Sequence, residues 1–365
     1  MNKKIRYCGF ALLAAAWIGL VCFAWFGEPT QVSEAERRQL AQFPEITGES
    51  LLDGSFMSDF EDYSLDQFPL RDSFRQVKAL FHYNVLGQSD NNGIYIADGY
   101  AVKQEYPLNE ISVNHALKRL NYIYEKYLAD SRVYMAVVPD KGYYLAEEND
   151  QLAMDYAALF NMVEAGMPWA THVDLTGTLN GQCYYRTDTH WRQELLLPAA
   201  SALCEAMGVT GPKAEDYTQR SLERPFYGVY YGQAALPMEP ETLYYLESDL
   251  LAGCTVSNFE TGKTAAVYDM DKLGSRDLYD VFLSGSAALL TIENPNAGTD
   301  KELIVFRDSF GSSIIPLLVQ DYRTVTVIDI RYVAPEFLGQ LVEFHGQDVL
   351  MLYSTLVLNN SSVLR

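Results

Sequence analysis

The stretch Leu303-Ile304-Val305-Phe306-Arg307-Asp308-Ser309-Phe310-Gly311 leads from an apolar strand pattern directly into the start of a helix. Open α/β sheets place ligands and nucleophiles at this kind of junction, where a buried strand ends and a helix begins. The N-terminus of that helix and the backbone N–H of Ser309 would stabilise a developing negative charge. Ser309 is therefore a candidate nucleophile, although Asp308 or Ser309 could instead be an ordinary helix N-cap.

The same strand-and-helix alternation extends over most of the chain. Apolar strands are predicted at 132–138, 172–175, 303–306, 324–329 and 348–353, and helices at 109–128, 150–165, 194–207 and around 312–318. Near-continuous apolar strands separated by helices indicate a sheet that is buried on both faces. The sequence predicts a doubly wound, mainly parallel α/β domain over residues 91–365. Residues 210–300 are rich in tyrosine and turn residues, and we expect them to form an insertion that could roof the site.

The chain begins with Lys3, Lys4 and Arg6, followed by an uncharged apolar run from Tyr7 to Phe26. About 20 apolar residues are enough to span a bilayer as a helix. We predict a membrane anchor over residues 1–27, with the positive charges inside and the rest of the chain outside the cytoplasm. A cleaved signal peptide is the alternative, but Trp25 and Phe26 are bulky where cleavage needs small residues.

Residues 28–90 are predicted to be a mostly helical leading segment packed on the domain. Apolar residues recur at spacings of three and four over 56–63 and 72–83, which is typical of amphipathic helices. A further helix start, similar to a capping box, is predicted at 33–38.

The composition excludes some partners. The formal net charge of -21 argues against nucleic acid, whose phosphates require clustered Lys and Arg. Of the five cysteines, Cys183, Cys204 and Cys254 lie outside the anchor. One disulfide among them is an open alternative to three small buried hydrophobic side chains.

A second segment, Tyr185-Arg186-Thr187-Asp188-Thr189-His190-Trp191, supplies an acid and a base. On an extended chain, Asp188 and His190 point to the same side, so the carboxylate can orient the imidazole while its other nitrogen faces a serine. Trp191 could pack beside the pair and exclude water. A zinc site using the same two residues is a minor alternative, because no paired-histidine spacing accompanies them. No cofactor is expected, and no phosphate-binding glycine loop is visible.

These residues resemble a known group of proteins. The segment 186–191 resembles the acid–base segment of the SGNH-like acetyltransferase domains of the alginate O-acetylation proteins J and X, and 308–310 resembles their nucleophile block. The whole of residues 30–360 is still more similar to the DHHW proteins of Gram-positive bacteria. Motifs that carry this resemblance are Glu36-Arg37-Arg38-Gln39-Leu40-Ala41-Gln42-Phe43-Pro44, Asp66-Gln67-Phe68-Pro69-Leu70-Arg71, Tyr279-Asp280-Val281-Phe282-Leu283-Ser284-Gly285 and Asp329-Ile330-Arg331-Tyr332.

The resemblance implies an SGNH or flavodoxin-like fold, with Ser309 as nucleophile, His190 as general base and Asp188 as its orienting carboxylate. Two departures stand out: Thr189 replaces the first His of the motif that gives the DHHW proteins their name, and Arg307 stands where Gly often precedes Asp-Ser. Gly285 or Ser286 is the expected second oxyanion partner, with Trp191 and Arg307 lining the site.

Together these features predict a membrane-anchored, extracytoplasmic O-acyltransferase or acyl esterase that acts on a cell-envelope or exported polysaccharide through an acyl-serine intermediate. The resemblance also implies a multipass membrane O-acyltransferase as the partner that supplies the acyl group. The alternative is a catalytically inactive glycan-binding or assembly protein of the envelope. That alternative is supported by the Arg307 departure and the tyrosine-rich segment.

Overall fold

A computed structural model describes residues 3–33 and 35–365, with side chains described for 7–24, 27–33 and 35–365. The chain divides into two compact units, Met1–Asn92 with Tyr231–Met238, and Gly93–Tyr230 with Glu239–Arg365. Each unit is described separately below.

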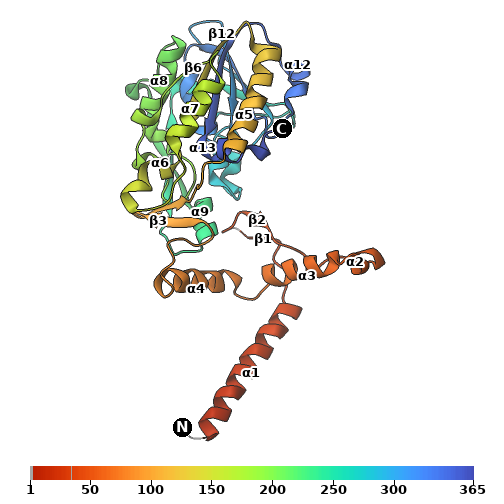
Figure 1. Ribbon diagram of the computed structural model, residues 1–365. Helices are drawn as coiled ribbons and strands as arrows, with labels where there is room; N and C mark the ends of the chain where they lie inside the picture. The colour runs from red at the N-terminus through yellow and green to blue at the C-terminus, as the bar shows by residue number, and fades with distance from the viewer. Residues whose placement is uncertain (1–2, 34) are drawn as a thin grey trace. The chain divides into compact units, whose positions relative to one another are not determined.

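The second unit is built on an eight-stranded sheet in the order β10-β9-β11-β13-β12-β14-β5-β6. Strands β6 and β12 of this sheet are labelled in Figure 1. Five neighbouring strands are parallel, and they are β13 (Tyr322–Ile328), β12 (Lys301–Arg307), β14 (Asp348–Ser354), β5 (Arg132–Val138) and β6 (Thr171–His172). The other edge is antiparallel and consists of β11 (Leu289–Glu293), β9 (Thr255–Asn258) and β10 (Thr264–Ala265). The predicted mainly parallel α/β fold is confirmed.

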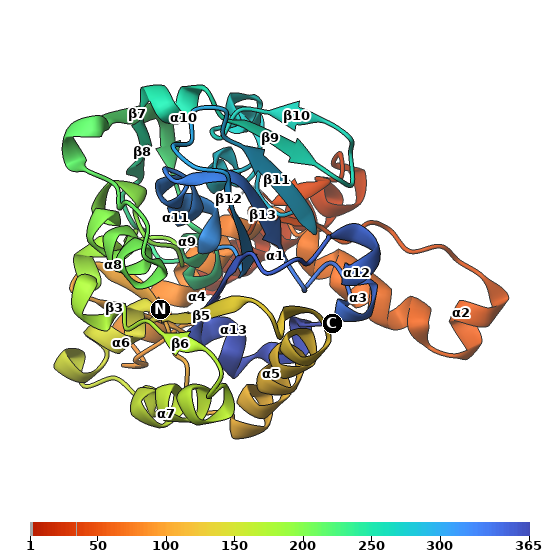
Figure 2. The ribbon, with the colours of Figure 1, turned by 90° about the horizontal axis from the view of Figure 1, so that it is seen from above.

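Alternate residues of each central strand enter two different cores, as the pleat of a strand requires. In β14, Leu350 and Leu352 join one hydrophobic cluster, whereas Met351 and Tyr353 join the other. Figure 2 shows α5 (Glu110–Ile123) and α7 (Tyr156–Gly166) beside the sheet, and their buried residues belong to the second cluster, whereas those of α8 (Leu197–Met207) belong to the first. The sheet is therefore buried on both faces.

Several boundaries differ from the predicted ones. Helix α5 continues as a π-helical turn, Tyr124–Leu128, so its predicted end is right. Helix α7 begins only at Tyr156, because the Asp155 side chain caps it by accepting a hydrogen bond from Ala158 N at 2.9 Å. Strand β6 stops at His172, since the chain then turns into a 3-10 helix, Thr176–Thr178.

The carboxyl end of the parallel strands carries short helices: α6 (Lys141–Leu145) follows β5, α11 (Gly311–Ile314) follows β12 and α13 (Thr355–Asn359) follows β14. In the described part of the second unit, two strand pairs lie outside the main sheet, β3 (Ile94–Ala97) with β4 (Tyr100–Lys103), and β7 (Thr218–Phe226) with β8 (Glu241–Glu247). The remaining short helices are α9 (Val229–Ala234), α10 (Asp249–Ala252) and α12 (Leu338–Leu341).

The region 210–300, predicted to be an insertion, consists of two structurally different parts. The hairpin β7–β8 forms a separate two-stranded sheet, whereas β9, β10 and β11 complete the antiparallel edge of the main sheet. The second part thus belongs to the core of the fold. Short edge strands had no clear apolar run, which is why the sequence pattern did not show them.

The first unit contains α1 (Lys3–Phe26), α2 (Gly48–Leu52), α3 (Ser55–Asp66) and α4 (Arg71–Asn84). Helix α1 includes an 18-residue window, Tyr7–Ala24, with a mean hydropathy of 2.0, so it is long and apolar enough to cross a membrane. A signal sequence meets the same criterion.

The helix start predicted at 33–38 is wrong over the described residues, and Glu34 lies outside them. Val32–Ser33 (β1) and Arg38–Gln39 (β2) pair as two short antiparallel strands. The Ser33 hydroxyl accepts a hydrogen bond from Glu36 N at 3.1 Å, as a cap would, but Arg37 has a φ of 54°, which a helix does not tolerate.

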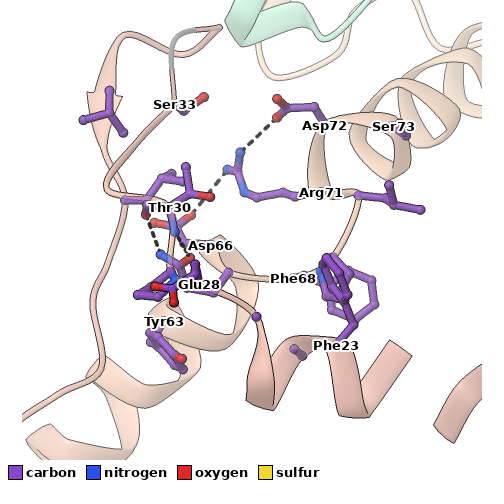
Figure 3. Close-up of a pocket in the computed structure, with 18 of the residues that line it drawn as sticks. Phe23, Glu28, Thr30, Ser33, Tyr63, Asp66, Phe68, Arg71, Asp72 and Ser73 are labelled. Atoms are coloured by element: carbon purple, nitrogen blue, oxygen red, sulfur yellow. Dashed lines mark hydrogen bonds and ion pairs between the residues drawn. The ribbon is translucent and has the colours of Figure 1, made fainter. Parts of the chain in front are cut away.

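A cavity of about 550 Å³ in the first unit is bordered by an ion-pair network (Figure 3). Asp66 pairs with Arg38 at 2.5 Å and with Arg71 at 3.4 Å, and Glu36 pairs with Arg71 at 2.5 Å and with Arg75 at 3.2 Å. These contacts connect β2, α3 and α4. The described part of this unit is thus held by charged groups as well as by its aromatic side chains.

Candidate active site

Three side chains at the carboxyl end of the sheet form a continuous hydrogen-bond chain. The His190 Nε2 atom lies 2.9 Å from Ser309 Oγ, and its Nδ1 lies 2.6 Å from Asp188 Oδ1. Ser309 follows β12 and precedes α11, and it is half-buried, whereas the His190 and Asp188 side chains are buried. The structure therefore brings together the three residues that the sequence predicted.

The Asp188 carboxylate is fully buried and receives several donors. Its Oδ1 accepts from the backbone N–H of His190 at 3.0 Å as well as from the ring, and its Oδ2 accepts from Val229 N at 2.8 Å. Because three N–H groups point at the carboxylate, its orientation is fixed. It can then hold Nδ1 as the donor and leave Nε2 free to take a proton from the serine.

Gly228 permits this arrangement by a close approach of two backbones. A Cβ at Gly228 would lie 2.2 Å from the carbonyl carbon and oxygen of Thr187 and 2.3 Å from the Cα of Asp188. Contacts this short do not occur, so only glycine fits. The Gly228 N–H donates to the Thr187 hydroxyl at 2.9 Å, which fixes the same contact.

Glu241, the first residue of β8, holds the other side of the acid–base segment. Its carboxylate accepts from Arg186 N at 2.8 Å, from Thr187 N at 2.7 Å and from the Thr187 hydroxyl at 2.8 Å. The β7–β8 hairpin is thereby connected directly to the residues that precede Asp188.

A buried lysine lies next to this segment. The Lys141 ammonium donates to the backbone carbonyls of Ala101, Tyr185 (2.9 Å) and Arg186 (3.4 Å), and it lies 5.0 Å from the ring centroid of Tyr230. Three acceptors match the three N–H bonds of an ammonium. Burial lowers the pKa of Lys141 to about 7, against the opposing attraction of Asp188.

The imidazole of His190 is held on its flat face by Tyr279. The two rings are stacked, with centroids 3.9 Å apart and an angle of 8° between the planes. The Tyr279 hydroxyl donates to Ser313 Oγ at 2.7 Å, and Trp191 Nε1 also donates to Ser313 Oγ, at 2.9 Å. Trp191 is fully buried and contacts Phe310 edge to face, so it packs beside the site as expected.

The turn that carries the nucleophile is fixed by its neighbouring aspartate. The buried Asp308 accepts from Phe310 N at 3.0 Å and, through its other oxygen, from Ser354 N at 2.7 Å and Ser354 Oγ at 2.6 Å. Among the described residues, the Ser309 N–H has no protein acceptor, so it is available to donate to an oxyanion.

The residues predicted to complete the site lie differently. The Gly285 N–H donates to the Phe282 carbonyl at 3.1 Å, so it is occupied within a tight turn, and no contact brings the exposed Ser286 to Ser309 among the described residues. Arg307 has no exposed surface, because its side chain runs beneath Gly311. Its guanidinium donates to the Gly285 carbonyl at 3.2 Å and lies 3.8 Å from the Asp329 carboxylate. Arg307 therefore supports the turn from below and does not line an open pocket.

The burial of Arg307 removes one reason for expecting an inactive protein. The other departure, Thr189, accepts a hydrogen bond from the Tyr230 hydroxyl at 3.0 Å and takes no part in the chain from Asp188 to Ser309. Over residues 3–33 and 35–365, no group of three or more His, Cys, Asp or Glu could hold a metal. Cys183, Cys204 and Cys254 are buried free thiols.

Four contributors were not predicted from the sequence: Lys141, Gly228, Glu241 and the stacking role of Tyr279. Tyr279 lies in one of the motifs that carry the family resemblance, and Lys141 lies three residues after the predicted strand 132–138. Both positions could therefore have been recognised in the sequence as candidates for the site. Gly228 and Glu241 lie in the tyrosine-rich region and reach the site only through the fold.

Comparisons with known proteins show what this chain is similar to. The model of the family described as DHHW protein matches residues 170–328, which confirms the resemblance to that family noted in the sequence. None of the curated proteins matches. A DHHW family protein from Eubacterium siraeum is 24% identical, with a TM-score of 0.60, and the match covers 75% of this chain and 95% of that one.

Two further solved structures are similar. Bacillus cereus PatB1 with a sulfonyl adduct is 18% identical, covers 73% of this chain and 95% of its own, and has a TM-score of 0.54. Pseudomonas aeruginosa AlgX is 11% identical, with 72% and 62% coverage, but its TM-score of 0.39 is too low to support an argument. The likenesses to the Eubacterium siraeum protein and to PatB1 establish a shared fold.

Proposed function

We propose that this chain, as a relative of the DHHW proteins, is a serine-dependent O-acyltransferase or acyl esterase that forms an acyl-serine intermediate at Ser309. The observation that carries the proposal is the unbroken hydrogen-bond chain from Asp188 through His190 to Ser309. A serine hydroxyl is a weak nucleophile until a neighbouring base removes its proton, and this chain provides that base.

The reaction has two balanced halves. Ser309 Oγ attacks the carbonyl carbon of the acyl donor while its proton passes to His190 Nε2, and the bond to the donor oxygen breaks as that oxygen takes the proton. A hydroxyl of the acceptor, or water, then attacks the acyl carbon and gives its proton to His190. Ser309 leaves and regains a proton. The Ser309 N–H, which has no protein acceptor among the described residues, would donate to the oxyanion in both halves.

The proposed acceptor is a polysaccharide of the cell envelope or an exported polysaccharide. We propose that α1 anchors the chain as a single-pass membrane protein, with the α/β domain outside the cytoplasm. A donor outside the cytoplasm has to be supplied through the membrane, and a multipass membrane O-acyltransferase is the class of partner that would do so. The apolar window Tyr7–Ala24 of α1 supports the anchoring. The resemblance of residues 186–191 and 308–310 to polysaccharide O-acetylation proteins supports the acceptor and the partner.

Acetate release from 4-nitrophenyl acetate tests the nucleophile. The purified chain should release 4-nitrophenol, and Ser309→Ala should reduce the rate to the background. Ser257→Ala, which changes an exposed serine on strand β9, should leave the rate unchanged. Equal rates for the wild type and Ser309→Ala, both with unchanged melting temperature, would contradict the proposal.

A sulfonyl reagent gives an independent test that needs no turnover. The related PatB1 fold has been seen with a sulfonyl adduct. With phenylmethylsulfonyl fluoride, Ser309 Oγ should form a bond to sulfur as the sulfur–fluorine bond breaks and fluoride leaves. Peptide mass spectrometry should place the adduct on Ser309, and His190→Ala should slow its formation. Labelling elsewhere, with Ser309 unmodified, would speak against an activated serine.

A further inference from the structure

Helix α4 turns its apolar side outward. Five exposed large apolar side chains are Leu70, Phe74, Val77, Phe81 and Val85, with 68%, 48%, 63%, 49% and 66% of their surface accessible, and Leu80, at 39%, is exposed outside this group. Their spacings of four, three, four and four residues place them in one stripe along the helix and its flanking caps. We call these five residues the α4 stripe.

The opposite side of α4 is polar and faces the rest of the first unit. Arg71 and Arg75 turn toward Glu36, at 2.5 and 3.2 Å, and Arg75 also donates to the Gly232 carbonyl at 2.8 Å. Ala79, one turn after Arg75 on the same side, is fully buried. An amphipathic helix on a water-soluble protein has the reverse arrangement, because each exposed apolar side chain forgoes about 1.5–3 kcal/mol of burial.

The beginning of α4 adjoins the end of the candidate membrane span. The cavity shown in Figure 3 is bordered by Phe23 and Gly27 from the end of α1 and by Leu70 and Ser73 from the start of α4. The side chain of Gln67, just before α4, exchanges two hydrogen bonds with the Thr30 backbone, at 2.8 and 2.9 Å.

Aromatic side chains lie beside the last turns of α1, which themselves stay largely exposed. A second cavity, of about 380 Å³, is bordered by Trp17 and Leu20 of α1 on one side and by Phe43, Phe60 and Tyr63 on the other. Aromatic rings gather at the level where a membrane-spanning helix leaves the bilayer. Helix α4 therefore starts at the depth of the lipid headgroups if α1 spans the membrane.

The dimensions and charges of α4 fit a helix that lies in this layer. Its 14 residues extend roughly 21 Å, which is too short to cross a bilayer. Arg71, Arg75 and Lys78 outnumber its single acidic residue, Asp72, in a chain whose formal net charge is -21. A basic amphipathic helix is typical of segments that lie in the membrane interface.

We propose that α4 lies parallel to the membrane in its interfacial layer, with the α4 stripe inserted among the upper acyl chains of the phospholipids. This inference rests on the membrane anchoring by α1 proposed above. It would give the protein a second attachment to the bilayer, which limits how far the first unit can tilt away from the surface.

Site-directed fluorescence on the full chain, reconstituted in phosphatidylcholine vesicles, tests the proposal. Cys8 and Cys22 are replaced by serine, since Cys183, Cys204 and Cys254 are buried and will not react. A fluorophore is then attached in the variants Val77→Cys or Phe81→Cys, and in the matched control Asp72→Cys. Asp72 is exposed on the side of α4 away from the stripe.

Quenching is measured with phospholipids that carry a nitroxide on the upper acyl chain and, separately, with iodide in the water. We expect strong lipid quenching and little iodide quenching at 77 and 81, and the reverse at 72. Iodide quenching at all three positions would overturn the proposal. Protection of 77 and 81 from both quenchers would also overturn it, because the stripe would then be covered by protein, either another part of this chain, a second copy or a partner.

A label at the native Cys22, with Cys8 replaced, separates this inference from the anchoring itself. If Cys22 is quenched by the lipid nitroxide but positions 77 and 81 are not, α1 is inserted and the α4 proposal is wrong. If Cys22 is not quenched by the lipid nitroxide either, α1 is not inserted, and the anchoring proposal is wrong together with the α4 proposal that rests on it. Thermal unfolding of each labelled variant verifies that the substitution leaves the fold intact.

Discussion

At the scale of single residues, Asp188 and its neighbours explain how an acid–base pair is oriented before substrate arrives. Three N–H groups converge on this carboxylate, from His190 backbone and ring and from Val229. The loop on which it lies has no regular secondary structure of its own. Its conformation depends on the close approach of Gly228, the carboxylate of Glu241 and the ammonium of Lys141.

Replacing Asp188 by Asn should retain the fold and lower kcat by about four orders of magnitude. The hydrogen-bond donors from His190 and Val229 are all N–H groups, so the amide NH₂ of Asn would face one of them, and this repulsion should disturb the orientation of the imidazole. Steady-state hydrolysis of 4-nitrophenyl acetate measures this. A nearly normal kcat would mean that His190 and Ser309 suffice without Asp188.

Gly228→Ala should destabilise the protein and abolish activity, because the new methyl group would lie 2.2 Å from the Thr187 carbonyl. The expected loss is of the order of a few kcal/mol in the free energy of unfolding. Thermal or urea unfolding measures it. Gly177→Ala is the matched control, since nothing lies within 4 Å of its Cβ position. Equal stability of the two variants would show that the loop can move apart freely.

Lys141 makes a testable contribution to the dependence of stability on pH. Its pKa is about 7 in the folded chain and about 10.4 when unfolded, so between these values the unfolded chain binds more protons. Stability from this group therefore rises with pH over that window and is constant below pH 7. Between these two pKa values, the free energy of unfolding of the wild type should rise, relative to that of Lys141→Met, by up to about 1.4 kcal/mol per pH unit.

Urea unfolding at a series of pH values between 6 and roughly 10 measures this difference. Replacing the exposed Lys213 by Met serves as the control and should show no such trend. If the difference in stability between the wild type and Lys141→Met does not change with pH, Lys141 keeps its proton in the folded chain over the whole range.

At the scale of elements, the strands with continuous apolar runs could be predicted, whereas the edge strands could not. Strands β5 and β14 were predicted almost to the residue, because both faces of each are buried and the positions 133–138 and 349–353 are all apolar or aromatic. Strands β9 and β10 are short and half-exposed, and their identity depends on pairing with β11. The helix start predicted at 33–38 was wrong, because the backbone turns at Arg37, whose φ is positive, although the local sequence favours a helix.

The β7–β8 hairpin should support catalysis through a single residue at its end. Glu241→Ala leaves the Arg186 and Thr187 N–H groups and the Thr187 hydroxyl without their acceptor, at about 1–3 kcal/mol for each buried group. We expect lower kcat and a lower melting temperature. Glu247→Ala, at the other end of β8, removes only an exposed pair with Arg220 and should change either quantity little. Similar effects from both would mean that Glu241 has no specific link to the site.

At the scale of the whole molecule, the boundary predicted near residue 90 lies close to the division after Asn92. The return of Tyr231–Met238 to the first unit could not be foreseen, because those eight residues are tied there by contacts such as Asn91 Nδ2 to the Ala234 carbonyl at 2.8 Å. Local sequence patterns do not reveal contacts between segments so far apart in the chain. Whether residues 28–90 pack on the α/β domain stays a prediction.

The net charge of -21 should affect the choice of acceptor. An anionic oligosaccharide approaching this chain is repelled over distances comparable to the Debye length, and salt shortens that length. We expect kcat/KM for acyl transfer to an anionic acceptor to rise with sodium chloride, and that for a neutral acceptor of equal length to stay constant. The opposite trend for the anionic acceptor would indicate a local basic site that outweighs the overall field.

The stacking of Tyr279 on His190 makes the imidazole visible to magnetic resonance. A proton that lies above an aromatic ring experiences the ring current, so the carbon-bound protons of His190 should resonate upfield of those of an exposed histidine. The chain has five histidines, and isotope labelling of histidine alone would give a sparse spectrum. Because the ring centroids are only 3.9 Å apart, the shift would report any movement of the base away from Tyr279 as an acyl group arrives and departs.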